Sequence, residues 1–177
     1  MRKAIDIAYY FIELFKFDEE GLSNLKLNKL LYYAQGFSYQ RFSKPLFSDD
    51  IEAWPYGPVV AEVYKAFQPC GKNPITPIGK EPELTSEEEE LLIDVAREYG
   101  KYSASGLVSL THKSGTPWSM IYTPHMDGNV IPKSLIEDYF KTKEKQLDSL
   151  DVDFGEEDFI GYRDEDGYLV LPKEYDN

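Results

Sequence analysis

The sequence predicts a mainly α, compact single-domain fold of about six helices, with a short β or loop insertion and a candidate C-terminal β-hairpin. Two observations support this prediction: apolar residues recur at helical spacing in several segments, and helix-capping residues precede them. The chain has 177 residues, a length that suits one domain with an appendage and needs no metal or disulfide to fold. We take residues 1–150 as the helical domain and 151–177 as an acidic extension.

Two helices are predicted in the N-terminal part of the chain. Apolar residues at helical spacing predict the first over residues 3–17. The second carries one apolar stripe, made of Leu27, Leu30, Leu31, Ala34 and Phe37. On this pattern the opposite side of the second helix holds Lys26, Lys29, Tyr33 and Gln40, whereas Asn28, Tyr32 and Gln35 flank the stripe. Gly36 costs about 1 kcal/mol relative to Ala inside a helix, which the close approach of another element would offset.

The middle of the chain is richer in turn formers. Residues 44–54 predict one or two brief strands or an ordered loop, because turn-forming residues separate short apolar pieces. Pro58 suits the first turn of a third helix, where its missing N–H is not needed. Residues 69–83 are broken by Pro and Gly and predict an exposed connection.

The remaining helices are predicted from their caps. A fourth helix over residues 87–99 begins after a capping box, formed by Thr85 with Glu88 or by Ser86 with Glu89. Ser103 caps a fifth helix that ends near Gly115, and Pro132 opens a sixth. Near the C-terminus, two β-prone runs around Asp-Glu-Asp-Gly predict a hairpin, placed either on the helical body or beside residues 51–54.

Charge and composition limit the classes of function. The net charge is −13, which repels phosphate backbones, so nucleic-acid binding is not expected. No cofactor is expected either. A single cysteine, Cys70, excludes a disulfide framework and favours the cytoplasm. The apolar start is interrupted by Asp6 and Glu13, and no segment has the length of a membrane span. Residues 151–177 hold ten acids and two bases, and serve either as solvated surface or as a steering surface for a basic partner.

Catalytic and metal-binding patterns are weak. His112 and His125 are separated by Gly115, Pro117 and Pro124, so they cannot share a helix face as paired zinc ligands do. Cys70 has no sequence neighbour that would lower the pKa of its thiol, and no phosphate-binding glycine loop is present. The acidic cluster of the tail does not match a calcium loop. We therefore expect no enzyme and no metal site.

Several ordered motifs together resemble one known family. They are an Asn-Lys-Leu-Leu-Tyr helix, a Pro-Leu-Phe segment, an Ala-Trp-x-x-Gly-Pro-Val corner and a helix-end His followed by Pro-Trp. In this chain they are Asn28, Lys29, Leu30, Leu31 and Tyr32; Pro45, Leu46 and Phe47; Ala53, Trp54, Gly57, Pro58 and Val59; and Leu107, His112, Pro117 and Trp118. From about Lys3 to Leu147 the chain resembles the Panacea antitoxin domain family, also known as SocA-like or GepA-like phage-associated proteins.

The resemblance implies a compact helical domain that acts as an antitoxin. Family members neutralise a toxin encoded by the adjacent gene through direct contact, and their toxins include alarmone-synthetase-like proteins. One branch is a proteolytic adaptor that delivers its toxin to a protease. The resemblance therefore implies a cognate protein toxin as the partner, with a prophage or mobile-element origin.

Two groups of residues follow from these motifs. The candidates for partner binding are Asn28, Lys29, Tyr32, Tyr33, Gln40 and Tyr56. The candidates for structural roles are Trp54, Gly57, Pro58, His112, Pro117 and Trp118. Asn28, Lys29 and Tyr32 are also candidates for buried supports, with Asn28 bonded to backbone near Trp54. Two rival functions stay open, namely a hydrolase that uses His112 with a carboxylate from elsewhere in the fold, and a prophage interaction protein without a toxin.

Overall fold

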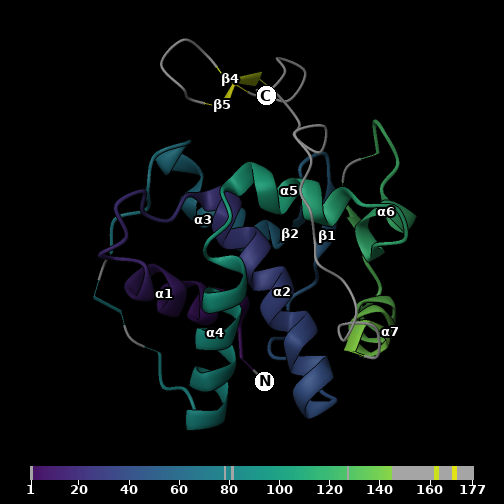
Figure 1. The fold of residues 1–177 in the computed structure, drawn as a ribbon, viewed down its shortest axis with the longest axis horizontal. Helices are drawn as coiled ribbons and strands as arrows, with labels where there is room; N and C mark the ends of the chain where they lie inside the picture. The colour runs from purple at the N-terminus through teal and green to yellow at the C-terminus, as the bar shows by residue number, and fades with distance from the viewer. Residues whose placement is uncertain are drawn as a thin grey trace.

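One long helix, α2 (Asn24–Phe42), runs through the middle of the fold, with the other helices around it (Figure 1). The computed structural model describes residues 2–77, 79–80, 82–126 and 128–144, and the backbone of residues 162–163 and 169–170. The further helices in the described ranges are α1 (Ala4–Leu14), α3 (Ala61–Phe67), α4 (Ser86–Tyr99), α5 (Ala104–His112), α6 (Pro117–Ile121) and α7 (Lys133–Glu144), with one 3₁₀ turn at Gln68–Cys70. The predicted mainly α fold is confirmed.

A small antiparallel sheet lies at one end of α2. Its strands are β1 (Glu52–Trp54), β2 (Gly57–Val59) and β3 (Asn129–Val130), in the order β2-β1-β3. Ala53 lies opposite Pro58 on one side and opposite Asn129 on the other. The sheet therefore joins the hairpin that precedes α3 to the segment that precedes α7.

Local capping residues define where the helices begin. The hydroxyl of Ser23 accepts a hydrogen bond from the backbone N–H of Lys26 at the start of α2. Thr85 and Glu88 form the predicted capping box of α4, and Ser103 caps α5 through the N–H of Gly106. Each cap satisfies backbone donors that have no partner inside the helix.

One predicted helix start is wrong, and one helix was not predicted. Pro58 does not open a helix, because it lies in β2 opposite Ala53, and α3 begins only at Ala61. A proline fits this edge strand because the sheet order gives β2 a single neighbour. The helix α6 was not expected at all, although Thr116 caps it and Pro117 occupies its first position.

The tail hairpin is present as β4 (Tyr162–Arg163) and β5 (Leu169–Val170), which pair antiparallel. They form a separate two-stranded sheet, and the strand beside β1 is β3 rather than the tail. The other residues of the predicted acidic extension, 151–177, lie outside the described residues.

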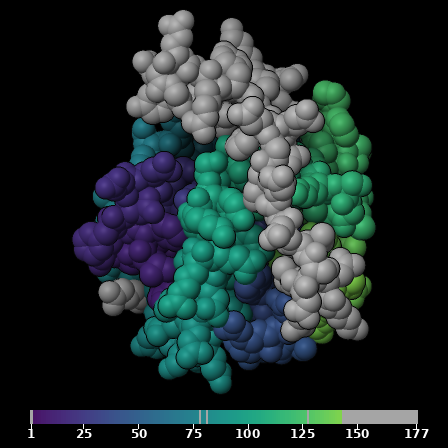
Figure 2. Space-filling model, in the orientation of Figure 1, coloured from purple at the N-terminus to yellow at the C-terminus, as the bar shows by residue number. Residues whose placement is uncertain are grey.

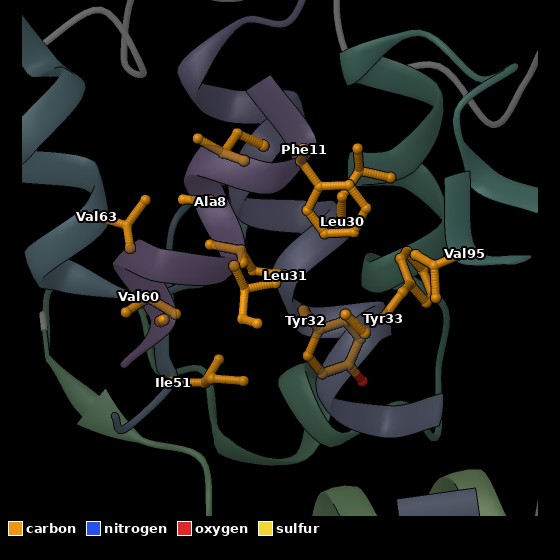
Figure 3. Packing of buried hydrophobic residues seen from close by; sticks show 14 of the residues in the cluster. Ala8, Phe11, Leu30, Leu31, Tyr32, Tyr33, Ile51, Val60, Val63 and Val95 are labelled. Carbon is orange, nitrogen blue, oxygen red and sulfur yellow. The ribbon is translucent and has the colours of Figure 1, made fainter. Parts of the chain in front are cut away.

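The core forms around α2. Figure 3 shows Leu30 beside Phe11 of α1 and Tyr33 beside Val95 of α4, while Leu31 points toward Val60 and Ile51. Gly36 is needed because a Cβ there would lie 2.4 Å from the Phe140 ring of α7, so the predicted close approach is confirmed. In the part of the chain that is described, no helix has the length and apolarity needed to cross a bilayer.

Candidate functional site

The motif residues, although distant in sequence, meet at one buried junction. We call the junction the contact region of Asn28 and Lys29 on α2, the β1–β2 hairpin, and residues 111–118. Direct contacts of α2 and α5 with β2 bring these segments together. Its residues differ in burial: Lys29, Gly57 and Trp118 are buried, Trp54 and His112 are half-buried, and residues 113–115 are exposed.

Asn28 connects α2 to the chain that leaves β2. Its Oδ1 accepts a hydrogen bond of 3.0 Å from the N–H of Val60. Its Nδ2 donates to the backbone carbonyl of Asn24 at 3.0 Å and to the Asn24 Oδ1 at 2.9 Å. Asn24 in turn donates to the carbonyl of Tyr64 at 3.0 Å. Asn28 thus bonds to backbone next to the Trp54 corner and fixes the start of α3.

Lys29 is an amine enclosed by the protein. The residue is 0% exposed, and its Nζ donates to the Pro58 carbonyl at 2.9 Å. Burial disfavours the charged form and lowers the pKa of Lys29 from 10.5 to about 7. Near neutral pH this lysine is therefore divided between the charged and neutral forms.

Gly57 allows the hairpin to approach this amine. Its φ is +99°, in the region that favours glycine. A Cβ at Gly57 would lie 2.6 Å from the Thr111 hydroxyl and 2.9 Å from Cε of Lys29. Only glycine fits between α2 and α5 here, which explains the glycine of the motif.

An aromatic stack closes the junction on the α5–α6 side. The ring of His112 stacks on Trp118 with centroids 3.7 Å apart, and Trp118 stacks on Tyr122 at 4.6 Å. The indole N–H of Trp118 donates to the Trp54 carbonyl at 2.8 Å. Trp54 itself donates to Glu52 Oε2 at 2.7 Å. Trp118 therefore anchors α6 to the sheet, whereas the bond of the Trp54 side chain stays within β1.

The junction lacks the features of a catalytic site in the described part of the chain. Burial, followed by the nearby Lys29, lowers the pKa of His112 from 6.5 to about 4, so His112 is neutral at physiological pH. Its Nε2 is buried, with no hydrogen-bond partner among the described residues. In a Ser-His-Asp triad a carboxylate orients the histidine, whereas the charged group that shifts the pKa of His112 is the lysine Lys29. The described residues also contain no group of three or more His, Cys, Asp or Glu placed to hold a metal ion.

Four of the six partner-binding candidates lie inside the protein. Asn28, Lys29, Tyr32 and Tyr33 are at most 4% exposed. The prediction that Lys29 and Tyr33 lie on the outer side of the second helix is wrong. Other elements pack against several faces of α2, and not only against its apolar stripe. Gln40 and Tyr56 keep part of their surface.

The structural candidates gather at the junction. Gly57, Pro58, Pro117 and Trp118 are buried, and Trp54 and His112 are half-buried.

Gln35 supports the fold in a way that the sequence pattern did not reveal. It is 0% exposed, and its Oε1 accepts hydrogen bonds from the N–H groups of Leu46 and Phe47 at 3.0 and 3.2 Å. Its Nε2 donates to the Phe47 carbonyl at 3.2 Å. The side-chain amide of Gln35 therefore holds the Pro-Leu-Phe segment. The sequence feature that could have indicated this role is the position of a polar residue beside the apolar stripe.

The fold and the junction define a helical domain whose polar motif residues hold its elements together. The chain belongs to the SocA-like antitoxin family with a Panacea domain, whose pattern it matches over residues 27–119. That range contains α2 from residue 27 onward, the hairpin, α5 and the start of α6, so the family match covers the whole junction.

The chain is also similar to a curated protein named Antitoxin SocA, from Caulobacter vibrioides (strain NA1000 / CB15N). The two are 36% identical over 112 residues, which is 56% of this chain and 60% of that relative. The chain thus spans about 60% of the length of the relative it matches. No solved structure matches the chain.

Proposed function

We propose that this protein is an antitoxin that neutralises a cognate protein toxin by direct binding. The observation that carries the proposal is the family match, which includes every element of the junction. The net charge of −13 and the aromatic content of 15% suit a surface that binds protein rather than nucleic acid. The toxin is a product of the adjacent gene, and alarmone-synthetase-like enzymes are one candidate class.

The burial of the motif residues supports binding over catalysis. Asn28, Lys29 and Gly57 use their polar groups and shape to join elements of the fold. A substrate would have no access to the amine of Lys29, which is 0% exposed. The motif therefore maintains a scaffold, and contact with a toxin falls to exposed side chains. Gln40 and Tyr56 remain candidates for such contact.

Expression of the adjacent gene, alone and together with this chain, tests the proposal. We expect growth arrest by the neighbour alone, relief by co-expression, and co-purification of the two proteins. A harmless neighbour, or a toxic one that is neither bound nor neutralised, would overturn the proposal. Repeating the assay in a protease-deficient host separates sequestration, which persists there, from proteolytic delivery, which does not.

A His112→Phe variant separates binding from hydrolysis. Phenylalanine keeps an aromatic ring against Trp118 but removes both ring nitrogens. An antitoxin that acts by binding keeps its protection in this variant. Loss of protection with unchanged toxin affinity would instead indicate chemistry at His112.

A further inference from the structure

Two apolar side chains project from the end of α1. Phe17 is 89% exposed and Leu14 is 42% exposed. Leu14 follows Tyr10 by four residues, so these two lie along one side of α1, and Phe17 lies in the turn three residues beyond the end of the helix. Isolated apolar residues on a surface are ordinary, but a row of them beside a hollow is typical of a contact site.

A pocket of about 260 Å³ lies beside this row. Its wall is formed by Tyr10, Glu13, Leu14, Lys16, Pro82 and Glu89. The lining therefore comes from α1 and the turn after it, from Pro82 in the loop before α4, and from Glu89 of α4. Figure 2 shows the purple surface of α1 next to the teal surface of α4. The pocket is large enough for one apolar side chain of a partner, with Leu14 in its lining and Phe17 three residues beyond.

The surroundings of the pocket are acidic. Glu13 and Glu89 belong to the lining, and the exposed Glu87 and Glu90 lie in the same first turns of α4. Residues 18–20, directly after Phe17, are three further exposed acids. The lining includes one described cation, Lys16, whose Nζ lies 3.6 Å from Glu13. The field at the pocket is therefore negative and attracts positive charge.

We propose that this surface, which we call the α1–α4 pocket, is a docking site for a basic protein segment that carries an apolar anchor. The proposal rests on the antitoxin function, and the segment belongs to the surface of the toxin. The anchor fills the pocket against Leu14, while Phe17, which is outside the lining, offers exposed apolar surface three residues further along the chain. Flanking lysine or arginine residues of the partner face the acids. This arrangement follows the usual anatomy of an interface, with an apolar centre and a charged rim.

A second copy of this chain is a poorer occupant. Each copy carries a net charge of −13, so two copies that meet at this surface bring like charges together.

The α1 half of the pocket precedes the family match, which begins at residue 27. The junction and the docking surface are therefore largely separate, and the surface can differ between family members that share the junction.

The test measures the affinity of the purified full chain for the product of the adjacent gene. Leu14→Ser and Phe17→Ser are each expected to weaken binding about tenfold or more, as truncation of an apolar residue at the centre of an interface does. Met120→Ser is the matched control, because Met120 is also an exposed apolar residue, at 60%. Its affinity should stay within about twofold of the wild type. Unchanged circular dichroism and Tm show that the variants are folded.

Charge variants test the chemistry of the partner. Glu89→Gln should slow association about twofold, and higher salt should weaken wild-type binding. Lys16→Gln removes a positive charge from the lining and should leave binding unchanged or tighter. Weaker binding by Lys16→Gln together with tighter binding by Glu89→Gln would overturn the proposal of a basic partner.

The outcomes separate the docking site from the antitoxin function. Wild-type affinity in both Leu14→Ser and Phe17→Ser overturns the α1–α4 pocket alone, since the toxin is still bound. A wild-type dimer that Phe17→Ser converts to a monomer assigns the surface to a second copy and also overturns it. Failure of the wild-type chain to bind or neutralise the neighbour overturns the antitoxin function and, with it, the docking site.

Discussion

Replacing the buried amine of Lys29 with the apolar side chain of methionine should make the protein more stable at neutral pH. The pKa of Lys29 falls from 10.5 in the unfolded chain to about 7 in the fold. Each unit of this difference corresponds to about 1.4 kcal/mol, so the charged form is disfavoured in the fold by about 5 kcal/mol. Most of this cost is present at pH 7, where the unfolded lysine is fully charged.

Methionine removes this cost but also removes the donor to the Pro58 carbonyl. A buried carbonyl that loses its partner costs about 1–3 kcal/mol. We therefore expect Lys29→Met to raise the free energy of unfolding by about 1–3 kcal/mol at pH 7. Met and Lys have similar lengths, so the change leaves no large cavity.

The pH dependence gives a sharper test than the absolute value. Between pH 7 and 10.5 the unfolded state binds more protons at Lys29 than the folded state, so stability rises with pH. From pH 7 to pH 9 this group alone contributes a rise of about 2 kcal/mol to the wild type, and none to Lys29→Met. Taking the difference in free energy of unfolding between the wild type and Lys29→Met cancels the contributions of the other titrating groups.

Urea unfolding followed by tryptophan fluorescence at pH 7 and pH 9 measures both effects. Lys65→Met is the control, because Lys65 is exposed on α3, and it should change stability by less than about 0.5 kcal/mol. The reasoning is refuted if Lys29→Met is less stable at both pH values while its difference from the wild type does not change with pH. Such a result would mean that Lys29 is charged and stabilising in the fold.

Three further substitutions test the packing and the caps. Gly36→Ala places a methyl group 2.4 Å from the Phe140 ring. It should lower the free energy of unfolding by about 1–2 kcal/mol, after the gain in helix propensity is counted. When it is combined with Phe140→Leu, the loss of stability should be smaller than the sum of the two single effects. Thr85→Ala should cost about 1 kcal/mol, whereas the neighbouring Ser86→Ala should cost less than half of that, and equal effects would contradict the capping assignment. Asn28→Ala leaves a buried backbone N–H without its acceptor and should cost about 1–3 kcal/mol in urea unfolding; a neutral effect would contradict its bridging role.

Local signals in the sequence predicted much of the helical fold. The capping box of Thr85 and the cap of Ser103 involve residues three positions apart, so the segment alone contains the information. The value of Gly36 as a close-approach position was also predictable, because glycine inside a strong helical pattern needs a packing reason. Its partner Phe140 was not, since that contact depends on the tertiary arrangement.

The placement of Lys29 shows where the sequence pattern stops being informative. Periodicity assigns a lysine to the solvent side of an amphipathic helix, but α2 is surrounded by α1, α4, α5, α7 and β2. In such a central helix the polar side chains face other elements of the fold. They can be buried because they form hydrogen bonds there. The prediction that Pro58 opens a helix was wrong for a related reason. Its place in β2 depends on pairing with Ala53 and not on the local preference for a helix.

The most direct test of the account is the binding of the purified chain to the product of the adjacent gene, measured by calorimetry for the wild type, His112→Phe and Phe17→Ser. We predict saturable binding by the wild type, the same affinity for His112→Phe, and about tenfold or greater weakening for Phe17→Ser. Absence of binding by the wild-type chain to a neighbour that is toxic in cells would contradict the central claim that this protein neutralises its toxin by direct contact.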